Sequence, residues 1–261
     1  MKQIMLLIAT TISALIFWLV TKPFIGQPFS FSGGTLAIEI WLWPLVFLVF
    51  FAGFEALSFL LLDSKKAWLV IALNLLVFAL LFNPKEIIVW MGVLIALLFQ
   101  FSALQEVKEE NKNRLRLNVR SVIHSGMGRL VTSLLILISF AYFLNGGIRE
   151  AAQKNELPGV VRQAVQLAVG SYVSENLETQ NPSLRAQVTE KVLNQITIFL
   201  KPYFVFLPPV LAFGLFLILQ GLSALFVWLA IIFSMLIFWI LKMFKLIKIG
   251  TEQKEVETIF F

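Results

Sequence analysis

The chain has 261 residues, 59% of them hydrophobic, and its formal net charge is +6 at pH 7. Soluble domains contain about 45 to 50% apolar residues, so this composition excludes an ordinary soluble domain. It predicts an all-α fold, a polytopic transmembrane helical bundle of about six or seven spans. Because the chain has no Cys and one His, disulfides, Cys-ligated zinc and multi-His metal sites are excluded, and we expect no cofactor.

The first spanning helix is predicted over the apolar run from Ile4 to Val20. This run is longer than the hydrophobic region of a usual signal peptide, and no cleavage pattern of small residues precedes Lys22. We therefore expect the segment to stay in the membrane as a helix. A loop over residues 21–40 should follow it, with β character from Thr35 to Ile40.

The second helix is expected to begin at a membrane interface. Trp41 and Trp43 are typical of the headgroup region, where indole rings are favoured. Pro44 suits the first turn of this helix, because its missing N–H would have no partner there.

Two hairpins are predicted from apolar runs that are separated by short polar turns. The runs Trp43–Leu62 and Ala67–Phe82 flank the turn Asp63–Lys66, and the turn Asn83–Glu86 precedes the run Ile87–Leu104. Together with the first helix, these runs should form a compact four-helix transmembrane unit over residues 1–104.

Three carboxyl or amide side chains lie inside these runs, Glu55, Asn74 and Gln100, and Glu55 is the ionisable one. At a helical rise of ~1.5 Å per residue, Glu55 and Asn74 lie about 12 Å below one membrane face. Gln100 lies about 7 Å below the same face, a difference that a long side chain can bridge. These three residues form the candidate binding site, an intramembrane polar cluster without catalytic residues or a metal.

Two interpretations of Glu55 remain open. An isolated carboxylate in hydrocarbon costs at least ~2.5 to 3.5 kcal/mol, so Glu55 should be protonated, paired or turned inward. Either it handles a proton or cation, or it is a protonated group that donates to Asn74 and holds two helices together. No second carboxylate or basic residue shares this depth in the apolar runs, which favours the structural interpretation.

Residues 105–129 carry six basic and three acidic residues. Their apolar residues recur at helical spacing from Leu115 to Leu130, which predicts a basic amphipathic juxtamembrane helix lying on the lipid headgroups. His124 is expected at this interface and not as a ligand. The fifth transmembrane helix is predicted over residues 130–145.

Residues 146–202 are predicted to form an extramembrane helical hairpin. Asn181 and Pro182 are typical of a helix start, with Asn as the N-cap and Pro in the first turn. Basic and acidic residues balance between Gly146 and Leu200, which argues against nucleic acid as a partner. An apolar stripe from Leu184 to Phe199 either meets the first helix of the hairpin or is offered to a partner protein.

Residues 203–261 begin with a nearly continuous apolar stretch to Phe244. One helix of that length would be ~60 Å long, twice the hydrocarbon thickness. We therefore expect an apolar hairpin, or a re-entrant segment plus a span, followed by a short charged tail.

The basic residues predict a cytoplasmic N-terminus, but they conflict over the C-terminus. Lys2, the turn Asp63–Lys66 and residues 105–129 fall on one side of the membrane, which should be the cytoplasm. Seven crossings would place Lys242 and Lys245 on the opposite side, whereas six crossings would return them to the cytoplasm. The side of the C-terminus stays open at this point.

The sequence lacks the motifs of common membrane and soluble enzymes, including a Gly-rich phosphate loop, Gly-x-Ser-x-Gly and His-Glu-x-x-His. We expect a non-enzymatic scaffold or partner-binding envelope component in the bacterial inner membrane. Its partners would be the lipid bilayer and an envelope protein that binds residues 146–202, with no nucleic acid. The alternative is a small transporter or channel that uses Glu55, Asn74 and Gln100.

Overall fold

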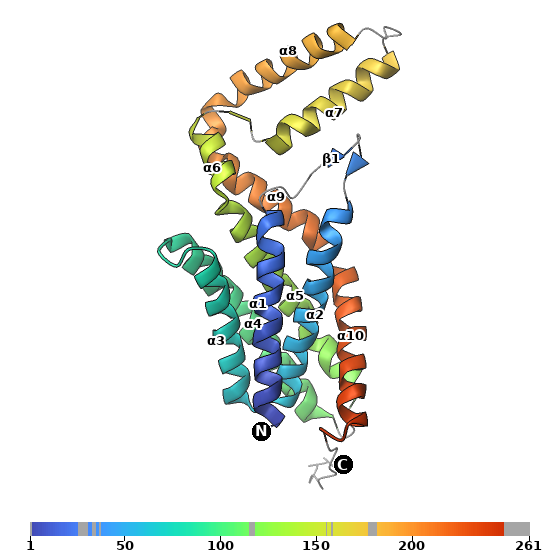
Figure 1. Ribbon diagram of the computed structural model, residues 1–261. Coiled ribbons are helices and arrows are strands. Elements are labelled where there is room, and N and C mark those ends of the chain that lie inside the picture. Colours follow the sequence, from blue (N-terminus) through green and yellow to red (C-terminus); the bar gives the residue numbers. More distant parts are fainter. Residues whose placement is uncertain are drawn as a thin grey trace, which may run out of the picture.

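The computed structural model describes residues 2–25, 31–32, 35–36, 38–114, 118–154, 156–157, 159–176 and 182–247. Helices dominate this part of the chain, and most of them form an elongated bundle (Figure 1). Seven helical segments are long and apolar enough to cross a membrane. The predicted all-α transmembrane bundle is therefore confirmed.

The bundle consists of α1 (Lys2–Ile25), α2 (Ile38–Leu61), α3 (Ser64–Leu81), α4 (Ile87–Asn113), α5 (Val119–Phe143), α9 (Leu207–Gly221) and α10 (Ser223–Met243). Between α5 and α9 the chain forms α6 (Gly146–Gln153), α7 (Gly159–Asn176), α8 (Pro182–Leu200) and the 3-10 helix η1 (Lys201–Phe206). The strands β1 (Phe31–Ser32) and β2 (Thr35–Leu36) pair antiparallel between α1 and α2.

Short turns make α2, α3 and α4 sequential antiparallel neighbours. Leu62 and Asp63 separate α2 from α3, and residues 82–86 separate α3 from α4. Asn83 in the second turn has a φ of 69°, a left-handed conformation that Asn adopts more readily than most residues. Pro84 follows it and has no N–H to donate to the preceding helix, so α3 does not continue beyond this turn.

α2 lies at the centre of the bundle, in contact with α1, α3, α4, α5 and α10. It runs antiparallel to α1, because the hydroxyls of Thr10 and Ser58 lie 2.6 Å apart while the rings of Phe17 and Phe51 lie 5.6 Å apart. As residue numbers rise along α1, the residues of α2 that contact it have falling numbers.

α10 runs parallel to α2. The Phe233 ring lies 4.1 Å from that of Phe50, and further along both helices Leu241 and Leu61 line one cavity. Gln3 lines the same cavity, so the end of α10 lies beside the start of α1 (Figure 1).

α9 and α10 together make one pass through the bundle. Pro209 at the start of α9 shares a cavity with Phe143 at the end of α5, and Thr132, midway along α5, hydrogen-bonds Gln220 at 3.4 Å. α9 therefore descends obliquely beside α5, and α10 continues to the far end. The described chain thus crosses the bundle in six passes, which removes the conflict that seven crossings raised over Lys242.

The single amphipathic helix predicted over residues 105–129 is not observed. α4 continues to Asn113, and α5 already begins at Val119. The two extensions pack closely, because Gly126 lies so near α4 that a Cβ there would come within 2.5 Å of the Ala103 carbonyl oxygen. The apolar face of this segment is buried by helix–helix packing, with Val107 at its centre, and not by lipid headgroups.

The start of the second helix also differs from the prediction. Strand β2 includes Thr35 and Leu36, as the β character indicated, but α2 begins at Ile38. Pro44 therefore lies inside the helix and not in its first turn. Its ring removes one donor from the helical ladder. The predicted N-cap Asn181 lies outside the described residues, although α8 does begin at Pro182.

Candidate functional site

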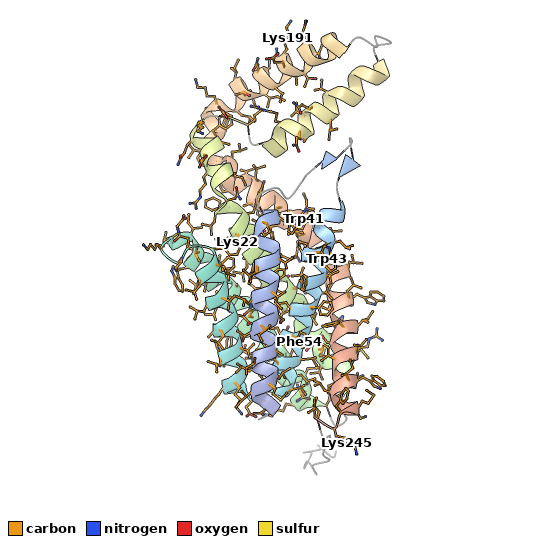
Figure 2. All side chains as sticks on the ribbon, viewed as in Figure 1. Lys22, Trp41, Trp43, Phe54, Lys191 and Lys245 are labelled. Carbon is orange, nitrogen blue, oxygen red and sulfur yellow. The ribbon has the colours of Figure 1, made fainter. Side chains whose placement is uncertain are left out.

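Glu55 lies on α2, the central helix, with none of its surface exposed. Neither of its carboxyl oxygens has a hydrogen-bond partner in the described part of the chain. The depth of the residue is visible from its neighbour Phe54 in Figure 2, which lies between Trp41, Trp43 and Lys22 at one end of the bundle and Lys245 at the other. Glu55 is thus an acid in the interior of a transmembrane bundle.

Two buried amides lie on the next two helices. Asn74 on α3 is 2% exposed and Gln100 on α4 is 0% exposed. The Asn74 amide interacts with the Glu55 carboxyl, but the two groups do not complete a hydrogen bond, and both amides lack partners among the described residues. The bundle therefore buries three polar side chains that are all unsatisfied.

All three residues of the predicted cluster are inside the bundle, and none faces lipid. α2, α3 and α4 contact one another, which brings the helices that carry Glu55, Asn74 and Gln100 together. That these residues bind a ligand stays a prediction.

Sequence reasoning missed three other buried polar contacts, each of which is satisfied. The Thr10 and Ser58 hydroxyls join α1 to α2 at 2.6 Å. Ser133 on α5 donates to the Ala96 carbonyl at 3.3 Å, and Ser234 on α10 donates to the Gly53 carbonyl at 3.2 Å. Small residues on the partner helix allow these approaches, and such residues are the signal from which the contacts could have been found.

Gly53 permits the closest of these approaches. A Cβ at Gly53 would come within 2.6 Å of the Phe233 ring and 3.3 Å of the Ser234 hydroxyl. α10 can therefore pack directly on α2, one turn or less from Glu55.

The chemistry open to the cluster follows from its burial. An unsatisfied buried polar group costs roughly 1 to 3 kcal/mol, so an uncharged carboxyl that shares its proton with a neighbouring amide is the least costly state. The described residues contain no group of three or more His, Cys, Asp and Glu side chains that could hold a metal ion. The cluster can hold a proton, a water molecule or a weakly bound cation.

Two cavities lie elsewhere in the bundle, and none of the three cluster residues lines either. The first, of about 450 Å³, lies between α4, α5 and α9, and we call it the α4–α5–α9 groove. The second, of about 440 Å³, lies between α1, α2 and α10, and we call it the α1–α2–α10 groove. Both are mainly apolar, and the polar cluster forms the wall of neither groove.

The fold and the buried cluster define a multi-pass helical membrane protein with a helical hairpin outside the bundle. No protein-family model, curated protein or solved structure matches the chain.

Proposed function

We propose that this protein is a non-enzymatic membrane scaffold that binds another membrane or envelope protein through residues 146–202. The observation that carries the proposal is the position of the α7–α8 hairpin. α7 packs on α8, and α8 continues into η1, so that the hairpin projects beyond the end of the bundle (Figure 1). A projecting pair of helices has surface to offer to a partner.

The base of the hairpin exposes apolar side chains. Ile198 and Phe199 at the end of α8 are 72% and 75% exposed, and Val205 and Phe206 in η1 are 80% and 62% exposed. Val192 and other residues earlier in the predicted stripe are half-buried, which supports packing against α7 there. Within residues 146–202, the apolar surface available to a partner is therefore centred on Ile198 and Phe199, where the hairpin joins the membrane bundle.

Charge supports an orientation with this hairpin outside the cell. The opposite end of the bundle is rich in basic residues, which favours the cytoplasmic side. Among the side chains that the structure describes, that end carries nine Lys and Arg against four Asp and Glu: Lys65, Lys66, Lys108, Lys112, Arg114, Arg120, Arg129, Lys242 and Lys245 against Asp63, Glu106, Glu109 and Glu110. We place the N-terminus in the cytoplasm of a bacterium and the bundle in its inner membrane.

Cross-linking in native membranes tests the scaffold proposal. The full chain should appear in a complex heavier than the monomer, and Ile198→Ser with Phe199→Ser should reduce that complex at least tenfold. Gln195→Ser is the matched control, since Gln195 is an exposed polar residue on the same helix. If the same partner is still cross-linked after residues 159–200 are replaced by a short linker, the proposal is refuted.

A second candidate function, transport of a proton or cation, is favoured by the unpartnered Glu55 carboxyl. Intramembrane ionisable residues commonly mark ion pathways. Glu55→Gln keeps the size of the side chain but cannot ionise. A flux in proteoliposomes that disappears with Glu55→Gln would support transport. If Glu55→Gln leaves the flux or a growth phenotype unchanged, proton transport through Glu55 is excluded and the scaffold proposal stands.

A further inference from the structure

The α1–α2–α10 groove runs from mid-bundle to the end that carries the basic residues. Phe54 and Ile237 line its deep part, and Gln3 and Leu62 line it at the ends of their helices. Figure 2 places Phe54 well inside the bundle and Lys245 at its lower end. The groove therefore has the direction and depth of a lipid acyl chain in one leaflet.

Two lysines are fixed at the mouth of this groove by the residues that line it. The Lys66 ammonium donates to the side-chain oxygen of Gln3, and the Lys108 ammonium donates to the main-chain carbonyl of Leu62. Both acceptors belong to groove-lining residues. The two positive charges are thus positioned where the polar end of a bound lipid would lie.

Acidic side chains compensate only part of this charge. The Asp63 carboxylate lies 3.3 Å from the Lys66 ammonium. Two acids further along this end are paired with arginines, Glu106 with Arg129 at 2.8 Å and Glu110 with Arg114 at 2.5 Å. At the mouth itself, two ammonium groups, those of Lys66 and Lys108, thus face the single carboxylate of Asp63.

The α4–α5–α9 groove at the other end provides the contrast. Arg149 donates to the carbonyl of Phe143, which lines that groove, but its guanidinium lies 2.7 Å from the Glu86 carboxylate. At that mouth, the Glu86 carboxylate therefore offsets the charge of Arg149. The two grooves have similar apolar volumes, so their difference in charge predicts a difference in the headgroup they accept.

We propose that the α1–α2–α10 groove binds an anionic glycerophospholipid of the surrounding bilayer. One acyl chain occupies the apolar groove, and the phosphate lies against the ammonium groups of Lys66 and Lys108. A basic residue near the membrane surface contributes about 1 kcal/mol of attraction to anionic lipid, which is about fivefold in affinity for each lysine. The bound lipid fills the space between the first, second and last helices of the bundle.

A photoreactive lipid tests the position of the site in the unmodified full chain. The protein is reconstituted in phosphatidylcholine nanodiscs that contain phosphatidylglycerol with a photoreactive acyl chain, and the cross-linked peptides are mapped. Cross-links should concentrate on Phe54, Ile237 and Leu241, and unlabelled phosphatidylglycerol should compete while extra phosphatidylcholine should not. Cross-links spread equally over lipid-facing positions such as Leu94, or equal competition by both lipids, would overturn the proposal.

Variants test the two parts of the site separately. Lys66→Gln with Lys108→Gln should weaken competition by phosphatidylglycerol about thirtyfold, whereas Lys22→Gln with Lys85→Gln at the other end should leave it unchanged. An equal loss in both double variants would show non-specific attraction and contradict the proposal.

Filling the groove tests the acyl-chain site independently of charge. Ala9 lines the groove, so Ala9→Phe should abolish the mapped cross-links, while Leu94→Phe on an exposed face of α4 should not. Cross-linking that persists in an Ala9→Phe protein with unchanged gel-filtration behaviour would overturn the acyl-chain assignment.

Discussion

At the scale of single residues, the cluster buries polar groups whose hydrogen bonds are incomplete, which costs folding free energy. Glu55 and Asn74 interact without completing a hydrogen bond, and no charged partner is needed if the carboxyl carries a proton. The bundle can retain such a group because lipid acyl chains would solvate the carboxyl no better than the protein interior does. The role of Glu55 in stability can therefore be separated from any role in transport.

Glu55→Gln should change the free energy of unfolding by less than about 1 kcal/mol, because an amide replaces an uncharged carboxyl of the same size. Glu55→Lys, which introduces an ammonium at the same depth, should destabilise the bundle by roughly 2.5 to 3.5 kcal/mol. Reversible unfolding in mixed micelles measures both. A large loss of stability with Gln would mean that Glu55 is ionised and paired in the folded protein.

Two glycines on α5 form a matched pair for testing close packing. A Cβ at Gly126 would come within 2.5 Å of the Ala103 carbonyl oxygen, whereas Gly128 has nothing within 4 Å. Gly126→Ala should destabilise the α4–α5 contact by roughly 1 to 3 kcal/mol. Gly128→Ala should stabilise the helix by up to about 1 kcal/mol. Equal effects of the two substitutions on thermal unfolding would contradict the described packing.

At the scale of the helices, α4 and α5 pack side by side towards the basic end of the bundle. The Arg129 guanidinium lies 2.8 Å from the Glu106 carboxylate and also donates to the Ser102 hydroxyl. Both charged side chains are partly exposed, so the ion pair should contribute modestly and the buried apolar contacts should dominate.

A double-mutant cycle with Glu106→Gln and Arg129→Gln should give a coupling energy of about 0.2 to 1 kcal/mol, which 1 M salt should reduce. The measurement is unfolding of the single and double variants under both salt conditions. A coupling above about 3 kcal/mol would mean that this pair is desolvated and that the extension is covered by another part of an assembly.

The helix boundaries show which features a sequence pattern can and cannot predict. Hydropathy and the turns at Asp63 and Asn83 were sufficient to predict α2, α3 and α4. The same pattern could not separate α4 and α5 in residues 105–129, because an amphipathic face packs equally well on lipid or on another helix. Nor could it predict the direction of α9, which depends on contacts with Phe143 and Thr132.

The candidate site was predictable to a similar extent. Glu55, Asn74 and Gln100 are recognisable because polar residues are rare in long apolar runs, and their burial follows from the cost of exposing them to lipid. The contacts of Ser133 and Ser234 were missed because serine is common in such runs, and the small residues opposite them, Ala96 and Gly53, were the only available signal. Their partners are backbone carbonyls, which become accessible only through the close approach of Ala96 and Gly53.

At the scale of the whole molecule, the six passes determine which surfaces share a side of the membrane. The start of α1 and the end of α10 lie at the basic end, and the α7–α8 hairpin lies at the other (Figure 1). The same arrangement separates the two proposed contacts. The proposed lipid site lies near Lys66 and Lys108 at the basic end, and the proposed protein-binding surface lies near Ile198 and Phe199 at the opposite end.

Single-cysteine labelling tests this arrangement most directly, because the chain has no Cys of its own. Gln195→Cys, Gln3→Cys and Lys245→Cys are each exposed to a membrane-impermeant maleimide in intact cells and again after permeabilisation. Six passes with the hairpin outside predict that position 195 is labelled in intact cells, and that positions 3 and 245 are labelled only after permeabilisation. Labelling of positions 195 and 245 from the same side would contradict the account.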